Sequence, residues 1–408
     1  MTGPPRGLAE VPDPAKGLDP LSTGTALVIR DAKVLPSPDL PSIDRATVVI
    51  RGGRISEVGP DASIPSSAQV LPGEGRVVTA GFWNVHVHFT EAKWRRVAKK
   101  PTALLEAQLH DMLTSHGFTT VVDTGSDPRS TFRLRQRIES DGMLGPAILT
   151  SGTGLYPPHG IPYYLRESLP FWWRPFLPTP ASPRAARRRA ERTLTAGADL
   201  VKLFTGSYVA RGTVRTMPEE IARAAVEVAH ARGRLVFSHP SNLEGTRVAL
   251  RSGVDVLAHP PDSTEGVDDG LLREMVARGM AMVPTLKMFA RTVTDRREYL
   301  EPIYDVVRRF RGLGGEILFG TDVGFMHDYT TEEELQALSV CGLGGREILR
   351  SLTTAPAHRF GVANDRGTVS AGSRADLVVL DADPLDHPLA LSRVRATIRN
   401  GRVLHLRP

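Results

Sequence analysis

The sequence predicts an α/β protein: a (β/α)8 TIM barrel with a small β-sandwich domain built from both chain termini. Two observations lead to this fold. Short β-type runs separated by turn residues occupy the chain before residue 80 and return after residue 361. Between them, eight apolar strand candidates alternate with eight helical segments, which is the pattern of a parallel barrel surrounded by helices.

The small domain is predicted over residues 25–80 and 362–408. Gly52-Gly53 and Pro72-Gly73 mark turns between its N-terminal strands, and we expect the C-terminal strands to complete the same antiparallel sheet. Residues 1–24 are rich in proline and glycine and are expected to form a flexible tail. The predicted strands are 26–30, 46–50, 54–58, 77–79, 375–380, 396–398 and 402–404.

The barrel is predicted over residues 81–361, where near-continuous apolar runs suit strands buried on both faces. Its predicted strands are 82–88, 118–123, 146–151, 200–204, 235–239, 254–259, 281–286 and 316–322. Its predicted helices are 102–115, 129–139, 184–195, 219–232, 244–251, 270–278, 295–312 and 332–340.

The connection over residues 152–183 is too long for an ordinary βα loop. It carries many prolines and the aromatic residues Tyr156, Tyr163, Tyr164, Phe171, Trp172, Trp173 and Phe176. We expect a lid-like insertion over a cavity; a packing insertion or an oligomer contact is the alternative.

The composition is that of an ordinary globular protein, with 41% hydrophobic and 24% charged residues among 408. Cys341 is the only cysteine, which excludes an intramolecular disulfide and a cysteine-cluster metal site. No apolar stretch approaches the length of a membrane span and the N-terminus has no signal-like apolar region, so we expect a cytoplasmic protein without a membrane partner.

The formal net charge is +6, and a dense run of five arginines extends from Arg184 to Arg192. A solvated helix face explains this run better than a nucleic-acid patch, because no aromatic or glycine pattern of a nucleic-acid module accompanies it. No nucleic-acid partner is therefore expected.

Two histidines one residue apart, His86 and His88, end the first predicted barrel strand. Side chains alternate along a strand, so both imidazoles lie on one face, where they can share a metal ion. His239, His259 and Asp322 stand at the ends of three later strands. Because barrel enzymes place their chemistry at the carboxyl ends of the strands, these residues are expected to converge.

Lys202 lies inside an apolar strand, where its amine has a poor route to water. Burial would lower the pKa of the amine towards the neutral form. A neutral amine can take up carbon dioxide as a carbamate, whose oxygen pair can bridge two cations. The alternative is a lysine that still reaches solvent.

Taken in chain order, these motifs resemble the amidohydrolase superfamily. The segments 352–361, 367–372 and 374–381 are similar to its C-terminal signature, and the likeness runs from about residue 26 to 404. The most similar branch is the imidazolonepropionase and metal-dependent prolidase (dipeptidase) group. The motifs are Gly81 with His86 and His88, Val201-Lys202, His239, His259 and Gly320-Thr321-Asp322.

The resemblance implies a metal-dependent hydrolase of amide or peptide bonds with two divalent ions, zinc first, with manganese, iron or cobalt as alternatives. His86, His88 and Asp322 would hold one ion, His239 and His259 the second, and N6-carboxylated Lys202 would bridge them. A bridging hydroxide would attack the carbonyl, with Asp322 as general base and acid. The substrate would be a dipeptide, an N-acyl amino acid or a similar small molecule, and a homo-oligomer is consistent with the family.

Three positions depart from the family pattern. Asn84 stands where an aspartate is usual and Ala80 where a proline is usual, which we interpret as changes behind the metal ligands or in a turn. Asn242 follows His239 by three residues, where deaminase-like relatives carry a glutamate proton shuttle. This favours hydrolysis over deamination.

Four residues are candidates for substrate contact: Tyr208 and Arg211 beyond the strand of Lys202, His159 in the insertion, and His327 beyond Asp322. Packing or surface exposure is the alternative for each. Two other functions remain open. One is the opening of a cyclic amide or lactone with a single metal; the other is a non-catalytic barrel that binds or assembles partners, against which the intact ligand set argues.

Overall fold

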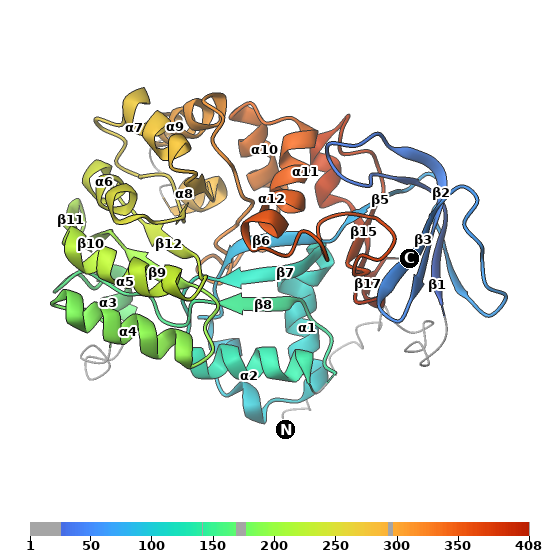
Figure 1. The fold of residues 1–408 in the computed structure, drawn as a ribbon, viewed down its shortest axis with the longest axis horizontal. Coiled ribbons are helices and arrows are strands. Elements are labelled where there is room, and N and C mark those ends of the chain that lie inside the picture. The colour runs from blue at the N-terminus through green and yellow to red at the C-terminus, as the bar shows by residue number, and fades with distance from the viewer. Residues whose placement is uncertain (1–25, 141, 169–176, 293–296, 408) are drawn as a thin grey trace, which may run out of the picture.

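The computed structural model describes residues 26–140, 142–168, 177–292 and 297–407. The tail predicted over residues 1–24 lies outside the described residues. Figure 1 shows a large α/β body beside a smaller sheet that contains both the first and the last strands of the chain. No described helix combines the length and the apolar character needed to cross a membrane.

Both ends of the chain contribute to one eight-stranded sheet, as the sequence predicts. Its order is β17-β16-β15-β5-β1-β2-β3, with β4 also paired to β1. The division into two facing layers that a sandwich implies stays a prediction, as do the predicted domain boundaries. The strands are β1 (Leu27–Val34), β2 (Ile43–Arg51), β3 (Arg54–Gly59), β4 (Gln69–Pro72), β5 (Val77–Ala80), β15 (Leu377–Leu380), β16 (Val394–Arg399) and β17 (Arg402–Leu406).

The prediction of a purely antiparallel sheet is wrong. β1 pairs in parallel with β4 through its first half and with β5 through its second half, and β4 was not predicted. The chain after β3 therefore runs beside β1 in the same direction, a choice that turn residues alone do not reveal. An apolar core that includes Leu27, Val48 and Leu377 lies against this sheet.

The barrel strands form two parallel sheets. The first has the order β6-β7-β8 and the second β14-β13-β12-β9, and every pair in both is parallel. The strands are β6 (Phe82–Val87), β7 (Phe118–Asp123), β8 (Ala147–Thr150), β9 (Val201–Phe204), β12 (Val236–His239), β13 (Val256–Leu257) and β14 (Ala281–Met282).

Three predicted barrel strands are wrong in extent. Those at 254–259 and 281–286 shorten to the two-residue strands β13 and β14, and 316–322 forms no strand. Prolines at 260 and 284 cannot donate to a ladder, and Thr285 and Asp322 have positive φ angles, which breaks extended backbone.

Isolated parallel bridges connect the two sheets on both sides. They pair Leu155 with Leu203, Met282 with Ile317, and Val87 with Val323. No continuous ladder closes all eight predicted strands within the described ranges, but these bridges follow the neighbour order of a barrel.

Helices surround these strands, and the predicted helices are found with two changes. The helix predicted over 102–115 ends at Met112, and the one over 295–312 begins at Leu300 after a short 3-10 turn. The helices are α1 (Thr102–Met112), α2 (Pro128–Glu139), α3 (Tyr163–Ser168), α4 (Pro183–Thr195), α5 (Glu219–Ala231), α6 (Leu243–Ser252), α7 (Asp269–Ala277), α8 (Leu286–Thr292), α9 (Leu300–Gly312), α10 (Glu332–Val340), α11 (Gly345–Leu352) and α12 (Thr354–Arg359), with 3-10 turns η1 (Ala92–Trp94), η2 (Val97–Lys99), η3 (Thr114–His116), η5 (Arg297–Tyr299) and η6 (Pro388–Ser392).

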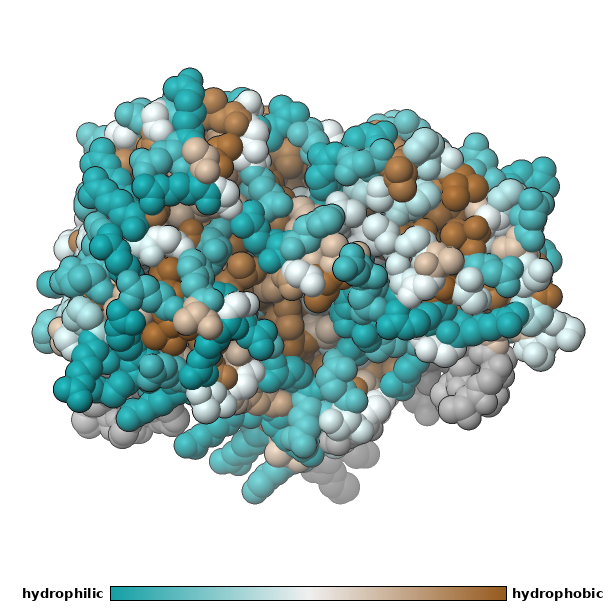
Figure 2. All heavy atoms as spheres, in the orientation of Figure 1, coloured by the Kyte–Doolittle hydropathy of each residue, from teal (hydrophilic) through white to brown (hydrophobic). Residues whose placement is uncertain are grey.

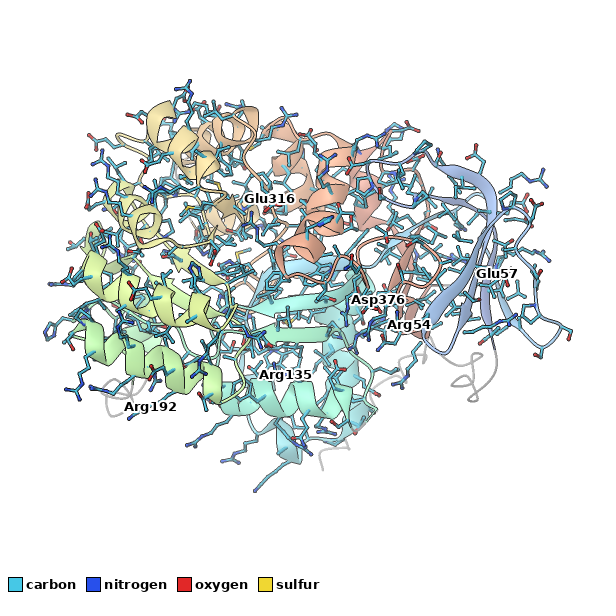
Figure 3. The ribbon with its side chains drawn as sticks, in the orientation of Figure 1. Arg54, Glu57, Arg135, Arg192, Glu316 and Asp376 are labelled. Carbon is cyan, nitrogen blue, oxygen red and sulfur yellow. The ribbon has the colours of Figure 1, made fainter. Side chains whose placement is uncertain are left out.

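The arginine-rich segment is the amphipathic helix α4, capped by Ser182. It buries Ala186, Ala190 and Leu194 against the body, and most of its arginines are exposed. Arg192 lies at the edge of the molecule in Figure 3, and polar side chains cover most of the face drawn in Figure 2. A solvated helix face accounts for the basic run.

The insertion at 152–183 begins with a buried stretch that contains Leu155 and Tyr156, and then forms α3. Phe171, Trp172, Trp173 and Phe176 lie outside the described residues, and the lid stays a prediction. Beyond β9 the chain forms a hairpin of β10 (Gly206–Ala210) and β11 (Thr213–Thr216), which was not among the predicted strands.

Candidate metal centre

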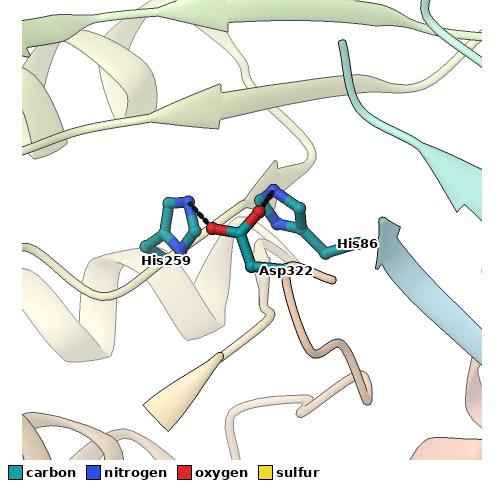
Figure 4. Close-up of side chains that lie close together, drawn as sticks. All are labelled: His86, His259 and Asp322. Carbon is teal, nitrogen blue, oxygen red and sulfur yellow. Dashed lines mark ion pairs between the residues drawn. The ribbon is translucent and has the colours of Figure 1, made fainter. Parts of the chain in front are cut away.

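Side chains from distant parts of the chain meet at the carboxyl ends of the barrel strands. Asp322 Oδ1 lies 3.0 Å from His88 Nε2 and 3.5 Å from His86 Nε2, and Asp322 Oδ2 lies 3.9 Å from His259 Nε2. Figure 4 shows the carboxylate between the rings of His86 and His259. These two histidines and Asp322 offer donor atoms within 4.8 Å of one another.

His239 and Lys202 complete the cluster. The ring centroid of His239 lies 4.7 Å from that of His259, which in turn is 4.5 Å from that of His86. Lys202 is 1% exposed, and its Nζ lies 5.5 Å from the centre of the Phe204 ring. The structure therefore brings all six predicted ligands into one region, although their individual roles stay predictions.

Backbone and hydroxyl oxygens orient two of the imidazoles. His88 Nδ1 lies 2.8 Å from the carbonyl oxygen of Gly125, which can only accept, so Nδ1 carries the proton. His259 Nδ1 lies 2.6 Å from Thr285 Oγ1, whose own proton is donated to the carbonyl of Pro284 at 2.8 Å. In both rings Nε2 faces the cluster, as in histidines whose second nitrogen fixes the ligand tautomer.

The backbone around Asp322 is tightly constrained. Asp322 itself has φ +58°, which is uncommon for a residue other than glycine. A Cβ at Gly320 would lie 2.8 Å from His86 Cβ, and one at Gly324 would lie 1.7 Å from the carbonyl oxygen of His88. Glycine is required at both positions because the strand of the paired histidines passes so close.

Asn84 connects the two segments that carry the ligands. Its Nδ2 donates to Thr321 Oγ1 at 2.6 Å, and its Oδ1 accepts from the backbone N–H groups of Thr321 at 3.2 Å and His86 at 3.3 Å. The interpretation that Asn84 lies behind the ligands agrees with this geometry. Its amide supplies both a donor and an acceptor, which an ionised carboxylate cannot do.

Asp123, at the end of β7, supports the turn beside His88. It accepts hydrogen bonds from Ser126 Oγ at 2.6 Å and Thr150 Oγ1 at 2.7 Å, and Ser126 Oγ accepts from the N–H of Phe89 at 2.8 Å. Burial raises the pKa of Asp123. Asp123 is not among the predicted site residues, although its place at the end of a predicted strand is a usable signal.

Burial controls the charges of the cluster. It lowers the pKa of His239 to about 3 and those of His86 and His259 well below the ordinary value, with Lys202 contributing to each. Burial alone would also lower the pKa of His88, but the Asp322 carboxylate raises it. Burial lowers the pKa of Lys202 to about 7, with Asp322 acting against the shift.

These groups fit a divalent transition metal. Three imidazoles with lowered pKa values are neutral near pH 7 and offer lone pairs, and the carboxylate supplies an anionic oxygen. Asp322 Oδ1 and His86 Nδ1 are both buried. Within the described part of the chain, neither atom forms a hydrogen bond of good geometry. Buried polar atoms are normally paired, and a cation would satisfy the carboxylate.

The four predicted substrate-contact residues are not gathered into one group. Tyr208 lies on β10, partly buried beside Asp262, whereas Arg211 is exposed at the tip of the hairpin. His159 is exposed and has a positive φ angle. The side chain of His327 is 80% exposed and its Nδ1 lies 3.0 Å from Glu91 Oε1. Their roles in substrate binding remain predictions.

The family model for amidohydrolases matches residues 77–404, which include every residue of this cluster. The chain belongs to the amidohydrolase family. Family membership indicates a metal-dependent hydrolase that acts on carbon–nitrogen bonds.

Relatives and solved structures agree with this family over most of the chain. A 5'-deoxyadenosine deaminase from Methanosarcina mazei is 23% identical over 93% of this chain and 92% of its own. An imidazolonepropionase from Thermoplasma acidophilum is 23% identical over 90% and 91%. The structure of a prolidase complexed with N-methylphosphonate-L-proline is 25% identical, covers 94% of this chain and 100% of its own, and has a TM-score of 0.77.

These similarities confirm the predicted imidazolonepropionase-like branch. Amidohydrolase structures imply a TIM barrel with a small additional domain, in agreement with the two parallel sheets and the separate eight-stranded sheet described above.

Proposed function

We propose that this amidohydrolase cleaves the amide bond of a small molecule, a dipeptide or an N-acyl amino acid. The observation that carries the proposal is the convergence of three imidazole Nε2 atoms on Asp322, at 3.0–3.9 Å. The similarity to a prolidase over nearly the whole chain supports this substrate class.

His86, His88 and Asp322 would hold one divalent ion, with zinc preferred by this mixture of nitrogen and oxygen donors. His239 and His259 would hold a second, and an N6-carboxylated Lys202 would connect the two. The lowered pKa of Lys202, about 7, supports carboxylation because a neutral amine is the form that reacts with carbon dioxide. Bound divalent ions would polarise the scissile carbonyl and lower the pKa of bound water towards 7.

Asp322 is the chain's own acid–base group in this proposal. Its carboxylate accepts a proton from the attacking water and returns it to the nitrogen of the leaving amine. The φ angle of Asp322 and the contacts of Asn84 with Thr321 fix its position, so that little reorganisation accompanies proton transfer. The hydrogen bonds from His88 and His259 to oxygen acceptors keep both rings in one tautomer.

Hydrolysis is favoured over deamination by the environment of Asn242. Its Oδ1 accepts from the N–H of Gly245 at 2.9 Å, which makes Asn242 the N-cap of α6. An amide that caps a helix has no proton to shuttle at neutral pH.

A second candidate is the opening of a cyclic amide with a single metal. The three donors that lie within 4.8 Å of one another combine residues from both proposed metal positions, which suits one ion as well as two. The similarity to an imidazolonepropionase supports the same alternative.

We further propose that the enzyme is cytoplasmic and that it forms a homo-oligomer.

The test combines metal analysis with one substitution. Protein prepared with zinc and bicarbonate is expected to contain about two metal ions per chain and to hydrolyse dipeptides or N-acyl amino acids. Asp322→Asn is expected to lower kcat by about 10²- to 10⁴-fold, which is the contribution of proton transfer in the transition state. Asp61→Asn, on an exposed loop, is the matched control. Unchanged kcat in Asp322→Asn would contradict the acid–base role, and one metal per chain would favour the cyclic-amide alternative.

A further inference from the structure

Glu334 is a fully buried carboxyl group in the first turn of α10, and its contact leads towards a predicted metal ligand. Its Oε2 accepts a hydrogen bond from the backbone N–H of Lys287 at 2.7 Å. Lys287 is the second residue of α8. Because the first N–H groups of a helix have no partner within that helix, an acceptor supplied by α10 fixes where α8 begins.

The residue before α8 is Thr285, which orients the ring of His259. Thr285 Oγ1 lies 2.6 Å from His259 Nδ1 and donates its own proton to the carbonyl of Pro284 at 2.8 Å. The other ring nitrogen, Nε2, lies 3.9 Å from Asp322 Oδ2 in the metal centre (Figure 4). Thr285 has φ +47°, and a β-branched residue keeps such an angle only where the surrounding structure holds it.

The two contacts belong to one continuous path. The carbonyl of Thr285 accepts from the N–H of Met288 at 3.0 Å, so Thr285 is part of the first turn of α8. The N–H that Glu334 binds lies two residues after Thr285 in the same turn. The oxygen acceptor of Glu334 therefore helps to set where Thr285 Oγ1 stands relative to the His259 ring.

A second contact fixes the same two helices against each other. The side chain of Lys287 donates from Nζ to the carbonyl of Thr330 at 2.7 Å and to its Oγ1 at 2.9 Å. Thr330 lies just before α10 begins. The start of α8 and the start of α10 are therefore connected at two points, one through Glu334 and one through Thr330.

The position of Glu334 has a cost that a space-filling side chain would avoid. Burial raises its pKa to about 7, although the N–H groups of Lys287 and Leu286 act against the shift. Burying a carboxyl group costs free energy, whereas an apolar side chain would be buried favourably. With or without its proton, the carboxyl group keeps a lone pair for the N–H of Lys287. The start of α8 therefore requires an oxygen acceptor at this position rather than a charge.

We propose that Glu334 is a positioning residue for the metal centre. Its carboxyl oxygen holds the start of α8, the start of α8 holds Thr285, and Thr285 keeps His259 Nε2 directed at the metal. The inference rests on the metal role of His259 in the proposed function. It adds to that function a residue beyond the ligands that sets metal affinity, as groups that orient metal-bound histidines do.

The deciding experiment measures the zinc affinity of the full chain by competition with a chromophoric chelator. Glu334→Met removes the acceptor, and zinc binding is expected to weaken about 10-fold. Glu334→Gln keeps an oxygen acceptor and is expected to stay within about 3-fold of wild type. Glu332→Met, at an exposed carboxylate in the same turn of α10, is the matched control and should bind zinc as wild type does.

A double-mutant cycle separates positioning through Thr285 from a general loss of stability. In a Thr285→Val background, Glu334→Met is expected to weaken zinc binding by no more than about 2-fold, because the path to His259 is already broken. A further loss as large as in the single variant would overturn the proposal, as would wild-type affinity in Glu334→Met alone.

If Glu334→Met does not fold, Glu334→Asp decides, because its shorter side chain withdraws the acceptor from α8. Weaker zinc binding in Glu334→Asp that disappears in the Thr285→Val background supports the positioning role. Unchanged zinc binding in Glu334→Asp overturns it.

The same proteins separate this inference from the proposed function. If zinc affinity changes as expected but no dipeptide or N-acyl amino acid is hydrolysed, the positioning role stands and the proposed reaction fails. If amides are hydrolysed and Glu334→Met binds zinc as wild type does, the reaction stands and the positioning role fails. A wild-type chain that binds no zinc would overturn both.

Discussion

Lys202 and Lys287 are equally buried, each about 1% exposed, yet their surroundings are opposite. Around Lys287, on α8, the ammonium donates to the carbonyl oxygens of Asp328 and Thr330 at 3.2 and 2.7 Å and to Thr330 Oγ1 at 2.9 Å, and Asp328 Oδ1 lies 2.9 Å away. Around Lys202, on β9, lie the Phe204 ring, neutral histidines and the Asp322 carboxylate, and among the described residues none forms a hydrogen bond with Nζ.

The difference shows that burial alone does not make a lysine reactive. Lys287 donates to a ring of oxygens, and these contacts fix the 328–330 segment that follows Asp322. Although burial alone would raise the pKa of Asp328, hydrogen bonds from Thr330 and Lys287 lower it to about 2. Lys202 lacks such partners, and its pKa falls to about 7. We infer that Lys287 is structural and that Lys202 is available for chemistry.

The largest expected effect comes from removing Lys202. Lys202→Met should lower kcat/KM by about 10³-fold, because loss of a metal-bridging group removes several kcal/mol of charge stabilisation in the transition state. Metal content should fall below that of wild type, as measured by mass spectrometry. Lys99→Met, at an exposed lysine, is the control. If Lys202→Met keeps the wild-type kcat/KM and metal content, the inference that Lys202 takes part in the chemistry is wrong.

Removing Lys287 should instead act on stability. Lys287→Met leaves two partly buried carbonyl oxygens and Asp328 without the Lys287 donor, and we expect the free energy of unfolding to fall by about 3 kcal/mol. Urea denaturation of the metal-free protein measures this loss. In the same assay Lys202→Met should be neutral or stabilising, so equal losses in both variants would contradict the comparison.

The pH dependence of stability should also separate the two sites. The pKa of Lys202 is about 7 in the folded chain and near its ordinary 10.5 when unfolded. Between these values the unfolded chain binds one more proton, so stability rises with pH from about 7 to 10.5 and levels off outside that window. The measurement compares the free energy of unfolding of wild type with that of Lys202→Met, both without metal or carbon dioxide. The difference, wild type minus variant, should increase by a few kcal/mol across this pH window. A constant difference would show that Lys202 keeps its proton when buried.

The smallest expected effect concerns an oxygen that orients a ligand. Thr285→Val removes the acceptor of the His259 Nδ1–H, and zinc affinity should weaken by about 10- to 100-fold, as for other groups that orient metal-bound histidines. Competition with a chromophoric chelator measures the affinity. Thr292→Val, at an exposed threonine of α8, should leave it unchanged. If both variants bind zinc equally well, the His259 ring is held by packing alone.

The sequence by itself determined where the ligands would stand. Apolar runs locate strands, strand periodicity places His86 and His88 on one face, and a barrel brings strand ends together, so these residues and His259 could be predicted to meet Asp322. Lys202 could be singled out because a lysine in the middle of an apolar strand contradicts its local pattern. Family motifs added the roles, which composition and periodicity do not contain.

Only the tertiary structure decided the partners. Thr285, Gly125 and Asp123 support the ligands through contacts between residues far apart in the chain, and no local pattern marks a threonine as the acceptor for a histidine 26 residues earlier. Lys287 takes its partners from a segment 41–43 residues downstream. Local sequence sets which face a side chain occupies, whereas the charge it carries there depends on the groups that the fold packs around it.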